Sequence, residues 1–245
     1  MAVNTDYKLE YDMLCGANES ALPVVIVAGG NSRRMDGVDK IKAEILSMPV
    51  IARTLVAFEK SSYISKIVVV TKEENFEYVK NICNRYSITK LFAVEKGGES
   101  RAISVLNGLN CLPGGTKTAL VHDAARPLVS EDVIKRVVLA DKKYVGVICS
   151  VPVTDTIKSV ENDLVKKTLN RNELVSVQTP QRVDLSVYLP LLTEQKKIVN
   201  FTDDASFLEK SGYEVLNVLG DYRNIKITTK LDLIIAKSLL EDNLL

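Results

Sequence analysis

A loop rich in glycine and arginine follows the first strongly apolar stretch of the sequence and could bind phosphate. It reads Ala28-Gly29-Gly30-Asn31-Ser32-Arg33-Arg34-Met35, and Lys40 and Lys42 lie just beyond it. Glycine lets the backbone turn sharply, and successive backbone N–H groups in such a turn can form an anion site. Arginine adds a planar fork of donors and lysine a mobile point charge. The alternative interpretation of this loop is a solvated basic turn.

The loop matches neither of two common nucleotide-binding signatures. It lacks the GxxxxGK[ST] pattern of P-loop proteins and the GxGxxG pattern of dinucleotide-binding proteins. An apolar strand followed by two glycines could still suggest a nicotinamide-dependent oxidoreductase. The missing glycine pattern argues against that interpretation, and a test of NAD binding would decide it.

Asp123 stands directly after a second apolar run, Thr118–Val121. Open α/β sheets place ligands at the carboxyl ends of their strands, and a carboxylate there is a suitable ligand for Mg²⁺. The alternative is an aspartate that caps a turn or helix. His122, the one histidine of the chain, is expected to be structural rather than a catalytic base.

Short apolar runs alternate with amphipathic stretches through the first half of the chain. The runs are typical of strands buried on both faces, and the stretches of helices. The predicted strands are 23–28, 67–71, 118–121 and 145–151, and the predicted helices are 50–60, 75–86 and 131–139. This alternation predicts a doubly wound α/β sheet.

The alternation is interrupted after Pro152. Residues 156–160 and 164–169 read as two strands around a turn at 161–163, a polar hairpin that should project from the domain. Alternation then resumes with a predicted helix, two strands and a closing helix at 204–210, 214–218, 224–228 and 230–240. Residues 1–21 show no clear periodicity and read as an extension before a domain that spans 22–245.

Composition excludes several classes of protein. The chain has 245 residues, 46% of them hydrophobic, with 32 Lys and Arg against 31 Asp and Glu. This nearly equal number of positive and negative charges does not predict a nucleic-acid binder. No apolar run approaches the roughly 18 residues of a membrane span, and the start of the chain does not resemble a signal peptide. Four widely spaced cysteines indicate reduced thiols, so we expect a cytoplasmic protein.

Six segments, taken together and in order, resemble the 2-C-methyl-D-erythritol 4-phosphate cytidylyltransferase family of the non-mevalonate isoprenoid pathway. They are AGGNSRRM at 28–35, HDAARP at 122–127, VPVTDTIK at 151–158, RNELVSVQTPQ at 171–181, TDDAS at 202–206 and NIKITT at 224–229. The resemblance implies a Rossmann-like, mostly parallel sheet of the nucleotidyltransferase type. It also implies a β-arm, at about residues 154–172, that clasps a second subunit in a homodimer.

The resemblance implies roles for individual residues. CTP and a sugar-alcohol phosphate would be the substrates, with Mg²⁺ on Asp123. Catalysis would depend on Arg34, Lys40 and Lys226, nucleotide binding on Ala28, Gly29, Gly30, Gly98, Glu99, Ser104 and Ala124, and acceptor binding on Thr156, Arg171 and Thr179. The family usually has Pro-Lys-Gln where this chain has Asp39-Lys40-Ile41-Lys42, so Lys42 is the alternative to Lys40.

Two other functions remain open at this point. A ribitol-5-phosphate cytidylyltransferase shares the fold and the chemistry, and an assay of both acceptors with CTP separates the two enzymes. A non-catalytic nucleotide-binding module of the same fold is the other possibility. The presence of Arg34, Lys40, Asp123 and Lys226 argues against a loss of activity.

Overall fold

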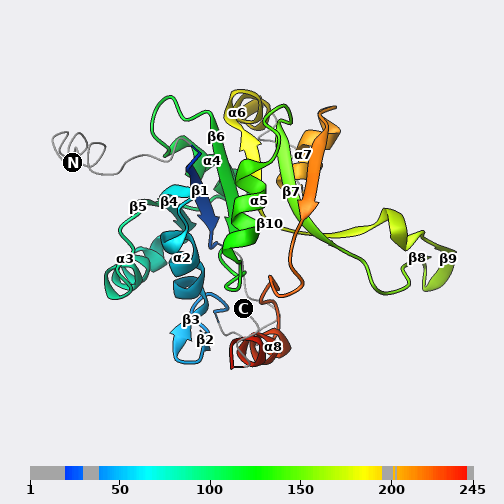
Figure 1. The fold of residues 1–245 in the computed structure, drawn as a ribbon, viewed down its shortest axis with the longest axis horizontal. Coiled ribbons are helices and arrows are strands. Elements are labelled where there is room, and N and C mark those ends of the chain that lie inside the picture. Colours follow the sequence, from blue (N-terminus) through cyan, green and yellow to red (C-terminus); the bar gives the residue numbers. More distant parts are fainter. Residues whose placement is uncertain (1–19, 30–38, 195–200, 202, 242–245) are drawn as a thin grey trace.

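The chain folds around one seven-stranded sheet, shown in Figure 1. The computed structural model describes residues 20–29, 39–194, 201 and 203–241. The strand order is β11-β7-β10-β6-β1-β4-β5. The strands are β1 (Leu22–Val27), β4 (Ile64–Thr71), β5 (Leu91–Lys96), β6 (Thr118–Asp123), β7 (Gly146–Pro152), β10 (Val175–Asp184) and β11 (Val215–Leu219). Strand β10 runs antiparallel to β6 and β7 while the other pairs are parallel, so the predicted mostly parallel α/β fold is confirmed.

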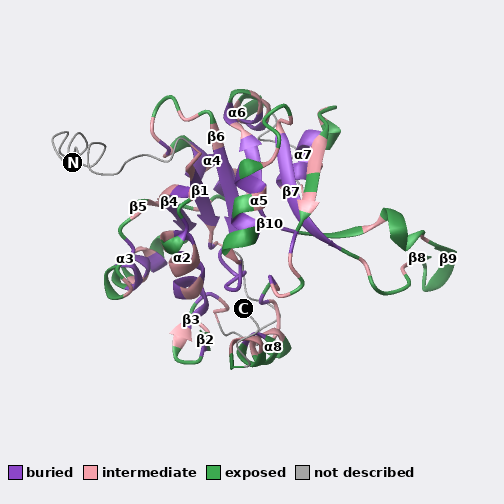
Figure 2. Cartoon of the chain, in the orientation of Figure 1, coloured by how far each residue is buried: buried purple, intermediate pink, exposed green. Residues whose placement is uncertain are grey.

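Helices cover both faces of the sheet because successive strand residues point in opposite directions. Val24 and Ile26 of β1 pack with α2 (Val50–Lys60), α3 (Phe76–Arg85) and α5 (Glu131–Leu139). Val25 faces the other side. The helices there are α4 (Arg101–Asn110), α6 (Leu185–Glu194) and α7 (Asp204–Lys210). Figure 2 shows the resulting buried centre, which fixes the strand ends that carry the site.

Strand β10 lies in the middle of the sheet although its sequence is largely polar, and we did not predict it. Gln178, Thr179, Gln181 and Arg182 are all buried in it. Burial of such groups is tolerated when they are hydrogen-bonded. The Arg182 guanidinium, for example, donates to the carbonyls of Val138, Ala140 and Asp141, at and just beyond the end of α5, at 2.6–3.2 Å.

A hairpin of β8 (Lys158–Glu161) and β9 (Leu164–Thr168) projects far from the sheet, as Figure 1 shows. Its turn residues, Asn162 and Asp163, both have positive φ, 49° and 62°. That combination is typical of the tight turns that join twisted antiparallel strands. The predicted projecting hairpin is therefore confirmed. The short 3₁₀ helix η2 (Arg171–Glu173) leads the chain back into β10.

The predicted strand at 224–228 is wrong, because this segment pairs with no strand in the described part of the sheet. It is held instead by the loop after β6. The Ile227 amide donates to the Ala125 carbonyl at 2.8 Å, and Arg126 donates to the Asn224 carbonyl at 2.8 Å. The segment leads into α8 (Lys230–Glu241), which packs beside the small hairpin of β2 (Glu44–Ile45) and β3 (Met48–Pro49).

Two further sequence expectations concern the chain as a whole. The first strand of the sheet begins at Leu22, and residues 1–19 of the predicted extension lie outside the described residues. Of the helices that the structure describes, none has the length and apolar character needed to cross a membrane.

Candidate active site

A pocket of about 250 Å³ opens at the carboxyl ends of β1 and β6. These strands and β4 run parallel, and their register places Val27 beside both Val70 and Asp123. The groups that follow the strands therefore meet at one edge of the sheet. The lining residues are Val27, Ala28, Gly29, Lys40, Ile41, Gly98, Glu99, Ser100, Arg101, Ser104, Asp123, Ala125 and Lys226.

The start of the glycine-rich loop is fixed by its neighbours in the sheet. The Ala28 amide donates to the Val70 carbonyl at 2.7 Å, and the Thr71 hydroxyl donates to the Ala28 carbonyl at 3.3 Å. Ala28 and Gly29, two of the predicted nucleotide-binding residues, line the pocket. Ala124 is fully buried behind the wall, and its amide donates to the Val27 carbonyl at 3.0 Å. Gly30 and Arg34 lie outside the described residues.

The opposite wall is the turn that begins α4. Ser100 caps this helix by accepting from the Ile103 amide at 3.2 Å. The Ser104 hydroxyl accepts from the Gly98 amide at 3.0 Å and donates to the Ser100 carbonyl at 2.9 Å. A Cβ atom on Gly98 would overlap the Ile103 side chain, so the turn requires glycine there. Gly98, Glu99 and Ser104 thus all lie at the pocket, within a rigid turn.

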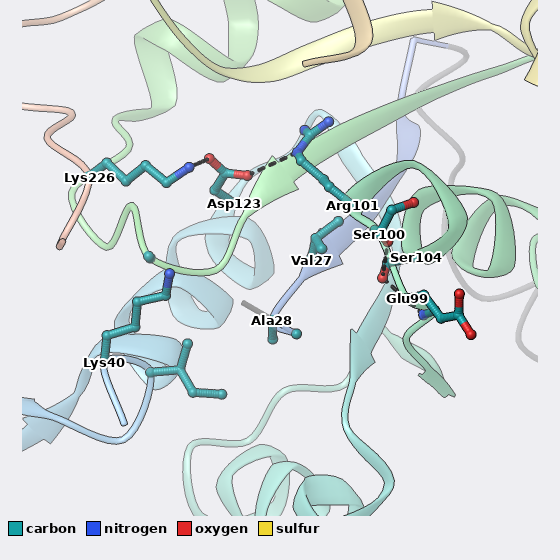
Figure 3. Close-up of a pocket in the computed structure, with 13 residues that line it drawn as sticks. Val27, Ala28, Lys40, Glu99, Ser100, Arg101, Ser104, Asp123 and Lys226 are labelled. Atoms are coloured by element: carbon teal, nitrogen blue, oxygen red, sulfur yellow. Dashed lines mark hydrogen bonds and ion pairs between the residues drawn. The ribbon is translucent and has the colours of Figure 1, made fainter. Parts of the chain in front are cut away.

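Asp123 is the centre of a cluster of opposite charges, shown in Figure 3. Its Oδ2 atom lies 2.7 Å from Lys226 Nζ and 3.9 Å from Arg126 Nε, and its Oδ1 atom lies 3.6 Å from Arg101 Nε. Burial alone would raise the pKa of this carboxyl, but Arg101 and Lys226 outweigh it and hold the pKa well below its ordinary value. Asp123 is therefore a permanent anion among cations.

Two lysines follow the loop, and the structure separates them. Lys40 lines the pocket, and Figure 3 shows its amine directed into it. Lys42 lies elsewhere, 3.9 Å from the Asp39 carboxylate and 5.0 Å from the centre of the Tyr78 ring. Of these two lysines, the structure therefore places Lys40 at the pocket and Lys42 away from it.

His122 is buried and structural, as expected. Its Nε2 atom lies 3.2 Å from the Arg126 carbonyl, and its Nδ1 atom lies 3.0 Å from the Thr179 hydroxyl. A carbonyl can only accept, so Nε2 carries the proton and Nδ1 accepts from Thr179. Burial is the main reason that the pKa of His122 falls from 6.5 to about 3. The ring is neutral and supports the backbone beside Asp123.

This histidine should make the fold sensitive to mild acid. With a pKa of about 3 when folded and 6.5 when unfolded, His122 binds its proton only in the unfolded chain between those values. Stability is then fully present above pH 6.5 and is lost as the pH falls. The free energy of unfolding should drop by about 2 kcal/mol from pH 6.5 to 5. Urea unfolding across this range measures the drop.

The control for this prediction is the His122→Asn variant, which cannot titrate. Carboxyls with a lowered pKa, such as Asp123 and Asp232, destabilise the fold only near and below their ordinary value of 3.8, so they contribute little between pH 5 and 6.5. The variant should be less stable than the native chain, but its free energy of unfolding should change little between pH 6.5 and 5. Equal slopes for the two chains would exclude His122 as the cause.

The predicted acceptor-binding residues do not gather in the pocket of their own chain. Thr156 and Arg171 are exposed on the arm, where the Arg171 guanidinium donates to the Thr154 carbonyl at 2.8 Å. Thr179 is buried, and its hydroxyl accepts from the Asp123 amide at 3.1 Å as well as donating to His122. Their roles toward the acceptor remain predictions.

Two charged residues that we did not assign to the cluster belong to it. Arg101, on the first turn of α4, reaches Asp123 on one side and Asp204 on the other, with its Nη2 atom 2.8 Å from Asp204 Oδ2. Asp203 caps α7 by accepting from the Ser206 amide at 3.0 Å, and Asp204, in the first turn of the same helix, is buried. The signal in the sequence was an arginine three residues after Gly97-Gly98.

A strand-end pocket with cationic side chains around one carboxylate, on a doubly wound sheet, is typical of a nucleotidyltransferase. The family pattern of 2-C-methyl-D-erythritol 4-phosphate cytidylyltransferase matches residues 22–242. Enzymes of that name from Bacillus cereus and Dehalococcoides mccartyi are 41% and 40% identical to it; each alignment covers 89% of this chain, and 96% and 95% of the respective relative. The chain belongs to the 2-C-methyl-D-erythritol 4-phosphate cytidylyltransferase family.

Solved structures agree with this assignment. The 4-diphosphocytidyl-2C-methyl-D-erythritol synthase of Anaerococcus prevotii superimposes with a TM-score of 0.81 at 27% identity, covering 93% of this chain and 99% of that one. The 2-C-methyl-D-erythritol 4-phosphate cytidylyltransferase of Francisella tularensis gives 0.73 at 30% identity, covering 89% and 99%. The similarity therefore extends over almost the whole fold.

Proposed function

We propose that this chain transfers a cytidylyl group from CTP to 2-C-methyl-D-erythritol 4-phosphate and releases pyrophosphate. The products are 4-diphosphocytidyl-2-C-methyl-D-erythritol and pyrophosphate, on the route to isoprenoid precursors. The observation that carries the proposal is the charge cluster: Lys226 and Arg101 face Asp123 in a pocket that Lys40 also lines. Such a pocket can neutralise a triphosphate and a second phosphate at once.

The chemistry requires positioning and charge rather than a protein nucleophile. An oxygen of the acceptor phosphate attacks the α-phosphorus of CTP, a new P–O bond forms, and the bond to pyrophosphate breaks. Both reactants are anions, and negative charge spreads over the α-phosphate oxygens. Lys40 and Lys226, which come from segments far apart in the chain, supply fixed positive charge there, with Arg34 as a further candidate.

A magnesium ion fits the donor set around Asp123. The described residues contain no group of three or more His, Cys, Asp or Glu side chains that could hold a metal unaided. Mg²⁺ often takes one or two carboxylates and completes its shell with waters and substrate phosphates. Asp123 lines the pocket, and its Oδ1 atom lies 3.6 Å from the nearest arginine nitrogen, beyond hydrogen-bond reach. When bound, the ion would supply further charge neutralisation.

The arm is proposed to complete the pocket of a second copy of the chain. Val160, Leu164 and Val165 of the arm are 58–66% exposed, an unusual position for apolar side chains at the end of a projection. A homodimer would cover them and would bring Thr156 and Arg171 to the partner's pocket. A cytoplasmic location is also proposed, since the described cysteines Cys83, Cys111 and Cys149 are unpaired thiols.

The Arg171→Ala variant should bind the acceptor poorly. The loss of one charge-assisted bond to phosphate costs about 1.5–3 kcal/mol, so the KM for the acceptor should rise roughly 10- to 150-fold. The KM for CTP should stay within about twofold of the native value, since the arm is proposed to bind the acceptor and not the triphosphate. Lys166→Ala is the matched control, because Lys166 is an exposed arm cation that pairs with Glu161 at 3.0 Å.

A mixed dimer tests whether the site is shared. Arg171→Ala chains have a complete pocket and a defective arm, while Lys40→Ala chains have the reverse. If the arm of one chain serves the pocket of the other, a heterodimer contains one complete site, and activity should return on mixing. Lack of any recovery in verified heterodimers would contradict the shared site.

The function itself is tested by pyrophosphate release from CTP, Mg²⁺ and a panel of acceptors. We expect activity with 2-C-methyl-D-erythritol 4-phosphate and a strong preference for CTP over UTP, ATP and GTP, because a pocket shaped for cytosine leaves polar groups unpaired with other bases. Faster turnover of ribitol 5-phosphate would assign the chain to the other acceptor. Nucleotide binding without pyrophosphate release from any acceptor would indicate a non-catalytic module.

A further inference from the structure

A second carboxylate lies directly behind the pocket and holds Arg101 from the far side. Asp204 is 2% exposed, and burial of a carboxylate is unfavourable unless donors surround it. Tyr188 donates its hydroxyl to Oδ1 at 2.6 Å, and Arg101 Nη2 lies 2.8 Å from Oδ2. The Gln181 side chain fixes the backbone by accepting from the Asp204 amide at 3.1 Å. Asp204 is thus a rigid anchor.

Arg101 is shared unequally between two carboxylates. Its Nη2 atom makes a hydrogen bond to Asp204, while its Nε atom remains 3.6 Å from Asp123 Oδ1. A guanidinium beside one free carboxylate usually forms two parallel hydrogen bonds with it. Here Asp204 takes one nitrogen of the guanidinium, and the distance from Arg101 to Asp123 is longer than a hydrogen bond.

We infer that Asp204, braced by Tyr188, keeps Arg101 from closing onto Asp123 and so preserves Asp123 as a ligand for a divalent cation. Asp204 is a positioning residue, because it acts on the metal ligand through Arg101. Without its charge, Arg101 would pair with Asp123 through both edges of the guanidinium and compete with the ion for the same oxygens. The inference rests on the proposed function, which places Mg²⁺ at Asp123.

The test is the Mg²⁺ requirement for nucleotide binding in the Asp204→Asn variant, which keeps the side-chain shape and removes the charge. Calorimetric titration with CTP over a series of Mg²⁺ concentrations gives the concentration for half-maximal binding. We expect it to rise roughly 10- to 100-fold, the usual effect of losing a group that orients a metal ligand, and saturating Mg²⁺ should restore binding. Tyr188→Phe should shift it in the same direction by less.

The neighbouring residue supplies a matched control. Asp203 lies on the same turn, but its carboxylate contacts the Ser206 amide and the Gln181 amide group rather than Arg101. Asparagine is also a good helix cap, so Asp203→Asn should leave the Mg²⁺ requirement at the native value. An equal shift in both variants would indicate a general disturbance of α7 and would overturn the inference.

A double variant identifies Arg101 as the intermediary. In the Arg101→Ala background the guanidinium that Asp204 holds is absent, so adding Asp204→Asn should produce no further rise in the Mg²⁺ requirement. Residues that act through one another show such non-additivity, whereas independent effects add. Additive shifts would therefore overturn the inference.

Asp123→Asn separates a failure of this inference from a failure of the proposed function. If that variant binds CTP with the native dependence on Mg²⁺, the metal site assigned under the proposed function is wrong, and the inference fails with it. If Asp123→Asn abolishes the dependence while Asp204→Asn merely lowers the melting temperature, the metal site stands and Asp204 is a structural residue alone.

Discussion

Replacement of Lys40 by alanine is expected to lower turnover at least a hundredfold while the chain remains folded. Lys40 lines the pocket, and in the proposed reaction its amine meets charge that develops on the α-phosphate. Removal of one fixed donor of this kind costs on the order of 2.7–4 kcal/mol of barrier, which corresponds to about two to three decades in rate. Steady-state assays at saturating CTP and acceptor measure the loss.

Lys42→Ala is the control for this prediction. The residue lies two positions away and carries the same charge, but it contacts Asp39 and the Tyr78 ring instead of the pocket. Its removal should change turnover by no more than a few-fold, because an exposed pair of this kind contributes little. A large loss in the Lys42 variant with normal turnover in the Lys40 variant would reverse the assignment of the two lysines.

Asp123→Asn is expected to reduce turnover about a thousandfold and to remove the gain in CTP affinity that Mg²⁺ provides. The substitution keeps the size of the side chain but removes the anion that Lys226 and Arg101 face. Two opposite effects on the affinity for CTP follow. The ion loses its protein ligand, whereas the pocket becomes more positive and should hold metal-free triphosphate at least as well as before.

Calorimetry with and without Mg²⁺ distinguishes these effects. The native chain should bind CTP more tightly when the ion is present, and the variant should bind it about equally in both conditions. Asp184→Asn is a suitable control, because Asp184 ends β10 away from the pocket and accepts from Ser186. Native turnover in the Asp123 variant would remove the central residue from the proposed mechanism.

The fold could be predicted from the sequence where burial leaves a simple pattern. Strands β1, β4, β6 and β7 are covered on both faces, so each required a continuous run of β-branched and other apolar residues. The arm was predictable for a different reason, since a polar turn between two short alternating stretches favours a hairpin. In both cases the signal lies within a few neighbouring residues.

Strand β10 could not be predicted in this way. It occupies the centre of the sheet, yet its buried positions include Gln178, Gln181 and Arg182. Their partners are carbonyls and carboxylates from loops and helices that lie far away in the sequence. A buried polar strand has no local signature, because its stability depends on groups that a single segment cannot reveal. The segment at 224–228 has the local pattern of a strand, but its backbone hydrogen bonds go to the loop after β6 instead of to the sheet.

The residues of the site also differ in whether a local pattern in the sequence could reveal them. The glycine-rich loop, the lysines after it and Asp123 could be proposed as a site because their residue types follow strand ends, where ligands bind. The choice of Lys40 over Lys42, and of Asp123 as a metal ligand, came from the resemblance. Lys226 was assigned by resemblance alone. The contact between Arg101 and Asp204 joins the first turns of two helices, α4 and α7, and no spacing in the sequence encodes it. Such contacts emerge once tertiary packing brings the helix ends together.

The charged groups of the pocket come from the beginning, the middle and the last quarter of the chain, and this has a consequence for folding experiments. The segments between these groups must all fold before the pocket can bind a triphosphate. Formation of the site therefore requires long-range contacts, whose loop-closure entropy is unfavourable. A fragment that ends before Lys226 lacks one wall. The recovery of catalysis during refolding would then report completion of the entire topology, whereas circular dichroism would register helices that form earlier.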